Sequence, residues 1–335
     1  MGGVLYLKSA IREKNRAQLS KRLDSHPIRT IEFWEEYKLE GKAVREANEY
    51  VLDYINLDNK LYGIKSVVAP SGDPKIIEVV DSVFENLPKT LHQLYSFKLL
   101  GVFPVTGLGT TGYTEIVYDK MGKVAGAFII VDMNYLKDPL DTWFSKREAM
   151  PFKPGELALS VRFTSETEKT SSKTLEYILV HELAHVISAN WKHHPHWNAK
   201  TINDISDYKY MSLSWKTDLS RKKYVPKLKP LLPYYGKLSF YKEPELPNSS
   251  MLGFFQTLAQ SNFPTPYSVS SFSEDFADSF ASYYFCIKNR VCPEYVVKKR
   301  DQELSRTKSC WETENCEEKK QYFDLLFSSD PMLGY

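Results

Sequence analysis

The sequence predicts an α+β protein on the basis of three observations. Apolar residues at helical spacing prevail up to about residue 65. Short runs rich in β-branched and aromatic residues follow between residues 102 and 163, and helical patterns return after Thr174. A block of strands between blocks of helices is typical of α+β domains. At 335 residues the chain is long for one compact domain, so we expect one domain with an extension, or two.

The N-terminal part is predicted to be helical. Residues 29–55 have apolar side chains at helical spacing and no internal proline. A short helix is expected over residues 73–88, because a proline stands at each end. Another is expected over residues 89–100, ending before a glycine.

Four strands are then expected, over residues 102–105, 114–119, 125–132 and 157–163. The turn YDKMGKV connects the second and third as a hairpin. The segment GLGTTG before the second strand matches the dinucleotide-binding pattern G-x-G-x-x-G. That pattern requires a helix directly after it, whereas a strand is expected here, so we interpret it as a glycine-rich turn. From residue 174 to the end, helical or irregular structure is predicted.

The charge balance excludes some classes of partner. Lys and Arg number 44 and Asp and Glu 42, so the net charge is +2, and neither nucleic acid nor an anionic membrane is expected as a partner. The basic run at residues 220–230 is interpreted as a solvated loop. No apolar run is long enough for a membrane span. We expect a monomer.

The cysteines indicate in which cellular compartment the protein works. There are four, Cys286, Cys292, Cys310 and Cys316, and no C-x-x-C pair that would indicate a zinc knuckle. An even, clustered set favours two disulfides, which persist in oxidising compartments, over four reduced thiols. Three connectivities are open. We therefore expect an exported protein, periplasmic or secreted, whose targeting segment is not part of this chain.

The segment ILVHELAHVISANW, residues 178–191, predicts a metal site. His181 and His185 are four residues apart, so a helix places both imidazoles on one face, where they can bind the same ion. Glu182 follows the first histidine, which suits a general base for a metal-activated water rather than a ligand. Histidine is the nitrogen ligand that Zn²⁺ takes in such sites. The alternative is an amphipathic helix whose histidines bond to backbone carbonyls.

A zinc site with two histidines needs a third protein ligand. The metzincin pattern requires a histidine where Trp191 stands, so that class is excluded. His193, His194 and His196 are expected to be surface residues in a loop, with the alternative that one of them lines a substrate cleft.

A later helix offers better candidates. In residues 265–285, Glu274 and Asp278 lie four apart beside Ala277 and Ala281, small residues that let two helices approach closely. Glu274 can supply a ligand oxygen, and Asp278 can accept the free N–H of a ligating histidine and fix its tautomer. The alternatives are a capping box between Ser271 and Glu274 and a solvated charge at Asp278.

This combination resembles the gluzincin metallopeptidases, which pair H-E-x-x-H with a later E-x-x-x-D helix. With Tyr267 seven residues before Glu274, it is most similar to anthrax lethal factor-type catalytic domains and related bacterial peptidases. The resemblance covers about 35 residues in two segments. It implies a zincin-like fold, Zn²⁺ held by His181, His185 and Glu274, and Tyr267 as a donor to the reacting carbonyl.

The resemblance also implies a domain organisation. A mixed sheet precedes the active-site helix, and residues 157–163 are the candidate edge strand for pairing with a peptide. The chain departs from this class in one respect, because the 88 residues between His185 and Glu274 are more than usual. Residues 198–265 are therefore interpreted as an insertion, a lid or a substrate-recognition element. We expect a helical extension over 1–65, the peptidase domain over 66–290, and a helical, cysteine-containing region over 291–335.

The function expected from these residues is zinc-dependent hydrolysis of peptide bonds. Two alternatives are kept: a non-catalytic zincin-like binding protein, against which the intact Glu182 counts, and an amidase acting on cell-wall peptides.

Overall fold

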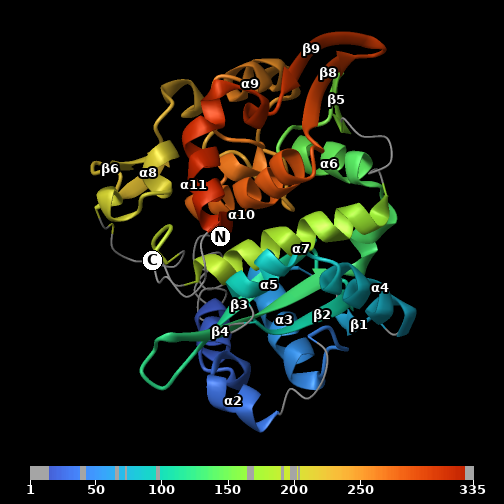
Figure 1. Ribbon diagram of the computed structural model, residues 1–335, viewed down its shortest axis with the longest axis vertical. Helices are drawn as coiled ribbons and strands as arrows, with labels where there is room; N and C mark the ends of the chain where they lie inside the picture. The colour runs from blue at the N-terminus through green and yellow to red at the C-terminus, as the bar shows by residue number, and fades with distance from the viewer. Residues whose placement is uncertain are drawn as a thin grey trace, which may run out of the picture. The chain divides into compact units, whose positions relative to one another are not determined.

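The computed structural model describes residues 15–37, 43–64, 68–71, 74–95, 99–163, 170–189, 192–196, 202 and 204–328 (Figure 1). The chain divides into two compact units. The first comprises Met1–Asn86 and Phe97–Tyr135, and the second Leu87–Ser96 and Leu136–Tyr335. The fold is α+β, as predicted, with a mixed four-stranded sheet and two smaller sheets in the described parts of the chain. The boundaries predicted at residues 65 and 290 stay predictions.

The first unit combines helices with the mixed sheet. Its strand order is β1-β2-β4-β3, in which β2 and β4 are parallel and the other pairs antiparallel. Residues 15–24 are helical. The remaining elements are η1 (Pro27–Arg29), α2 (Ile31–Glu36), α3 (Glu49–Tyr62), β1 (Ala69–Pro70), α4 (Pro74–Glu85), β2 (Leu99–Thr106), β3 (Gly112–Tyr118), β4 (Val124–Asp132) and η2 (Met133–Lys137), which runs into the second unit.

Two helix predictions in this region are partly wrong. The helix predicted over 29–55 is divided, because residues 43–45 are extended beside β2: Val102 donates to the carbonyl of Ala43, and the Arg45 N–H donates to the carbonyl of Val102. The helix predicted over 89–100 ends at Tyr95, and Leu99 already pairs with Ala127 of β4. In both places backbone pairing in the sheet prevails over a local helical pattern.

The turn predictions are confirmed. GLGTTG connects β2 to β3, and Gly107 and Gly109 have φ angles of 83°, which only glycine adopts without strain. The hairpin between β3 and β4 is closed by Asp119, whose carboxylate accepts from the N–H groups of Met121 and Lys123 at 2.8 Å.

The second unit is mainly helical with two small antiparallel sheets. Its elements are α5 (Lys89–Tyr95), α6 (Leu140–Ala149), β5 (Leu157–Phe163), α7 (Ser171–Ser188), η3 (Ile205–Asp207), α8 (Met211–Ser214), β6 (Trp215–Asp218), β7 (Lys223–Pro226), η4 (Lys229–Leu231), η5 (Asn248–Ser250), α9 (Met251–Leu258), η6 (Tyr267–Val269), α10 (Phe272–Tyr283), the π-turn η7 (Tyr284–Lys288), β8 (Pro293–Lys299), β9 (Gln302–Lys308), η8 (Cys310–Glu312), η9 (Glu314–Cys316) and α11 (Glu317–Ser328).

Two hairpins in this unit differ from the prediction of helical or irregular structure after residue 174. The pair β6–β7 lies in the predicted insertion, of which residues 202 and 204–265 are described. The pair β8–β9 lies in the C-terminal region, where a helical region was predicted. Among the residues described there, only 317–328 form a regular helix. The β8 strand buries Tyr295, Val296 and Val297, and this burial stabilises the sheet.

The strand predicted over 157–163 is present but belongs to the β5-β8-β9 sheet. It is an edge strand, as expected. Its outer side is already bonded, however: Asn248 accepts from the Leu157 N–H at 2.8 Å and donates to the Leu157 carbonyl, and the Ser145 hydroxyl accepts from the Val161 N–H at 2.7 Å. An added peptide would compete with these bonds.

Helices α7 and α10 form the centre of the second unit and lie side by side (Figure 1). Ala277 and Ala281 of α10 are fully buried, which agrees with the close approach predicted for this helix. The described part of the chain contains no helix long and apolar enough to cross a bilayer.

Both predicted disulfides are present, and the open connectivity is resolved as two local pairs. Cys286 bonds Cys292, joining the π-turn after α10 to the start of β8, and Cys310 bonds Cys316 just before α11. The two disulfides agree with an oxidising, extracytoplasmic location.

The disulfides give a simple prediction. Full reduction under denaturing conditions should raise the intact mass by about 4 Da, one hydrogen for each sulfur released. Intact mass spectrometry of protein made through an export pathway measures this. Four free thiols in such protein would contradict the disulfides and the compartment inferred from them.

Candidate metal centre

Helix α7 carries the two histidines on one face. The Thr170 side chain caps its N-terminus by accepting from the Lys173 N–H, and 18 residues then continue without glycine or proline. The rings of His181 and His185 lie one turn apart with centroids separated by 5.0 Å. Both histidines and Glu182 are buried. The helix is buried on nearly all sides from Leu175 onwards, so three ionisable groups in it require polar partners.

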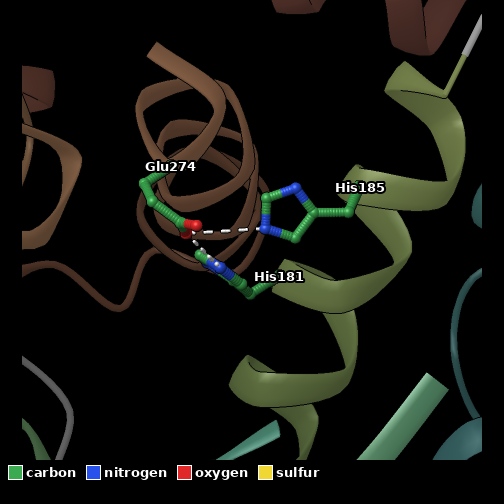
Figure 2. A group of neighbouring side chains, drawn as sticks. All are labelled: His181, His185 and Glu274. Atoms are coloured by element: carbon green, nitrogen blue, oxygen red, sulfur yellow. Dashed lines mark hydrogen bonds and ion pairs between the residues drawn. The ribbon is translucent and has the colours of Figure 1, made fainter. Parts of the chain in front are cut away.

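Helix α10 brings Glu274 to these histidines. Ser271 caps the helix by accepting from the Glu274 N–H at 3.2 Å, which is one half of the capping box considered for this position. The Glu274 carboxylate instead points to the histidines (Figure 2). Its Oε2 lies 3.1 Å from Nε2 of His181 and 3.5 Å from Nε2 of His185.

These three side chains can hold a metal ion, because one ligand atom of each lies within 4.8 Å of the others. Ligands bound to zinc at about 2.0–2.1 Å in tetrahedral geometry are about 3.3–3.4 Å apart. The two separations of Glu274 Oε2 from the histidine Nε2 atoms, 3.1 and 3.5 Å, bracket that spacing. Two imidazoles and one carboxylate are also the donor set of known catalytic zinc sites. The residues present therefore fit the ion.

The charges of the three groups support one another. Burial disfavours a charged His181, but its hydrogen bonds with Asp278 and Glu274 raise its pKa to about 10. Burial disfavours the Glu274 carboxylate, and the charge of His185 with the bonds from both histidines lowers its pKa below the usual range. The group thus keeps an ionised Glu274 carboxylate beside a His181 imidazole whose protonated form is favoured.

Asp278 lies one turn after Glu274 and behind His181. Its Oδ1 is 3.2 Å from His181 Nδ1 and accepts from the Tyr177 hydroxyl at 3.0 Å. The residue is fully buried, so the alternative of a solvated helix charge is wrong. Burial opposes its ionisation, and the neighbouring Arg147 and His181 lower its pKa. A carboxylate in this place holds the Nδ1–H of His181 and directs Nε2 toward Glu274.

Tyr267 lies in the 3₁₀ turn η6 that precedes α10. Its ring is 5.7 Å from the His181 ring and 4.7 Å from the Phe240 ring. Burial raises the pKa of its hydroxyl well above the usual value, and the charges of Glu274 and Glu182 add to the shift. The phenol therefore stays protonated and able to donate.

No family model matches this chain, and no curated protein or solved structure is similar enough to count as a match. The arrangement of the residues themselves therefore carries the functional argument.

The prediction that the three later histidines are surface residues is wrong for two of them. His193 and His194 are buried. The His193 ring stacks on Phe276 at 4.5 Å and its Nδ1 lies 2.6 Å from the Tyr322 hydroxyl. The Nε2 atom of His194 lies 3.1 Å from the Ser188 hydroxyl. Burial lowers the pKa of His194 to about 4. His196 is partly exposed. Both buried histidines thus have ring or hydrogen-bond partners within the second unit.

Sequence reasoning did not identify Arg147 and Glu148 of α6, which are both buried next to this group. The sequence does contain one indication that Arg147 is buried. Arg147 continues the apolar stripe of Leu140, Trp143 and Phe144 at helical spacing, and a charged residue in such a stripe needs a buried partner. That partner is Asp278, 131 residues later.

The role of Asp278 predicts a graded effect. Asp278→Ala should weaken metal binding about 10–100-fold, the usual loss when the partner of a ligating histidine is removed. A competitive chelator titration measures this. Asp324→Ala on α11, a partly exposed carboxylate paired with Lys320, is the control and should bind metal like the wild type. An Asp278→Ala protein with unchanged affinity would limit Asp278 to packing.

Proposed function

We propose that the chain is a zinc-dependent peptidase with a zincin-like catalytic domain of the gluzincin type. The observation that carries the proposal is the buried group of His181, His185 and Glu274, with the carboxylate of Glu182 adjoining the first ligand on α7. A purely structural metal site has no need for an additional buried carboxylate there. The natural substrate is a protein or peptide.

The proposed mechanism assigns one task to each side chain. A zinc ion held by His181, His185 and Glu274 would supply a Lewis acid and lower the pKa of water. Glu182 accepts the proton from the attacking water and delivers it to the leaving amine. Tyr267 donates its O–H to the carbonyl oxygen as negative charge develops on it. Asp278 keeps His181 oriented with Nε2 free to bind.

Two features support this assignment of tasks. Glu182 and Tyr267 are close enough for the charge of Glu182 to contribute to the raised pKa of the Tyr267 phenol. The Tyr267 ring also packs against His181, which places the phenol beside a ligand rather than in a remote core.

We propose that the protein works outside the cytoplasm, as a periplasmic or secreted enzyme. The two local disulfides and the absence of free cysteines among the described residues support this location.

The test combines metal analysis with peptide cleavage. Purified protein should contain about one zinc per chain, and a diverse peptide library should be cleaved, with cleavage stopped by a chelator and restored by added zinc. Zinc without cleavage of any peptide would favour the non-catalytic binding protein. Cleavage confined to cell-wall peptides would favour the amidase. Protein that takes up no zinc would contradict the proposal.

A further inference from the structure

Helix α6 presents a buried ion pair that the proposed mechanism does not use. Arg147 is 3% exposed and Glu148 is fully buried. The Arg147 Nε donates to Oε1 of Glu148 at 2.6 Å. A buried ion pair is weak evidence for stability, because well-packed apolar residues of similar size often serve as well. Its place beside the metal group therefore needs another reason.

The guanidinium reaches Asp278 with both terminal nitrogens. Nη1 donates to Oδ1 at 3.0 Å and Nη2 to Oδ2 at 3.1 Å. Two parallel bonds fix the plane of a carboxylate, which a single point charge does not do. The Oδ1 atom that Arg147 holds is the one that lies 3.2 Å from Nδ1 of His181. The orientation of the ligand thus depends on a carboxylate that Arg147 orients.

Arg147 itself is held in place on several sides. Its guanidinium lies over the rings of Trp143 at 4.7 Å, Phe144 at 4.6 Å and Tyr267 at 5.1 Å. On the other side, Glu148 accepts from the backbone N–H of Tyr267 at 3.1 Å. The guanidinium is therefore enclosed by Asp278, Glu148 and these rings, away from solvent.

We propose that Arg147 is a positioning residue of the metal centre, acting on His181 through Asp278. The inference rests on the proposed metal site and deepens it. It does not depend on which reaction the site performs, because its main readout is metal affinity.

The chain contains a matched control for the alternative that any buried ion pair on α10 matters equally. Lys319 of α11 pairs with Asp275 at 2.5 Å, and both side chains are fully buried. Asp275 is on α10, next to Glu274, and its partners are Lys319, Trp215, Tyr210 and Ser279. This pair joins α11 to the same helix without a bond to Asp278 or His181.

The experiment is a double-mutant cycle on zinc affinity, measured by competitive chelator titration on the full chain. Arg147→Met is expected to weaken zinc binding about 10-fold or more, within the range for outer partners of a ligand. In an Asp278→Asn background the same substitution should change affinity less than about threefold, because the residue through which it acts is already altered. Lys319→Met should lower the melting temperature while leaving zinc affinity within about threefold of the wild type.

Arg147→Lys covers the case in which Arg147→Met does not fold. It keeps the charge and loses the bidentate contact with Asp278. We expect it to weaken zinc binding by at least about threefold and to lower the melting temperature less than Arg147→Met does. Additive effects of Arg147→Met and Asp278→Asn, or an equal loss of zinc affinity in Lys319→Met, would overturn the proposal. A wild-type protein that binds no zinc would instead contradict the proposed function, so the two failures are distinguishable.

Discussion

Glu182→Gln is expected to keep about one zinc per chain and to lose about 10²–10⁴-fold in turnover, the contribution of a general base. Glu182 adjoins His181 in sequence, but the group that could hold a metal ion consists of His181, His185 and Glu274. Glutamine has nearly the same size, so the buried site should keep its packing. The amide has no basic oxygen, so the proton of the attacking water loses its acceptor.

Glu274→Ala is the complementary variant and should behave in the opposite way. It removes a ligand oxygen and the ionised partner of two histidines, so zinc content and turnover are expected to fall together. Metal analysis and initial rates on the same preparations measure both effects. The control is Glu176→Gln on α7, whose carboxylate pairs with Lys173, and it should resemble the wild type. Loss of zinc in Glu182→Gln with retention in Glu274→Ala would reverse the assigned roles.

The local part of the site could be predicted from the sequence. The spacing of His181 and His185 requires only a helix, and α7 is that helix. The long-range part needed a chemical argument: a third ligand was missing, and Glu274 lay on a helix with small residues that could pack against α7. The structure brings Glu274 to the histidines across 93 residues of sequence. The same argument led to Asp278 as the partner of His181, and the two lie in contact.

Arg147 could not be placed by that argument. The local pattern shows that Arg147 lies in an apolar stripe, but not which of the many carboxylates in the chain pairs with it. Its partner is determined by the packing of α6 against the rest of the second unit. The missed hairpins have a similar cause. In β9 only Thr307 is buried and most of its neighbours are exposed polar residues, so its strand conformation depends on pairing with β8 rather than on its own composition.

The second large effect is expected at Tyr267. Tyr267→Phe should lower kcat about 10²–10³-fold, the loss that follows removal of one oxyanion donor, with zinc content unchanged. The substitution keeps the ring that packs against His181 and Phe240 and removes only the hydroxyl. Because the pKa of this phenol is raised by burial and by nearby carboxylates, it keeps its proton and can donate at any working pH. The hydrogen bond from this hydroxyl strengthens as negative charge grows on the substrate carbonyl oxygen. The loss of kcat should therefore exceed the loss of substrate affinity.

The control for this variant is Tyr283→Phe on α10, which also removes a phenolic hydroxyl from a buried ring. The Tyr283 hydroxyl donates to Asp324 and the Tyr284 hydroxyl to Glu176, so neither bonds to the ligand group. Tyr283→Phe should therefore keep kcat near the wild-type value. If Tyr267→Phe also keeps kcat within a factor of about three, under about 1 kcal/mol of barrier, Tyr267 is a packing residue only. The donor would then be sought at Tyr241, whose ring lies 6.5 Å from the ring of Tyr267.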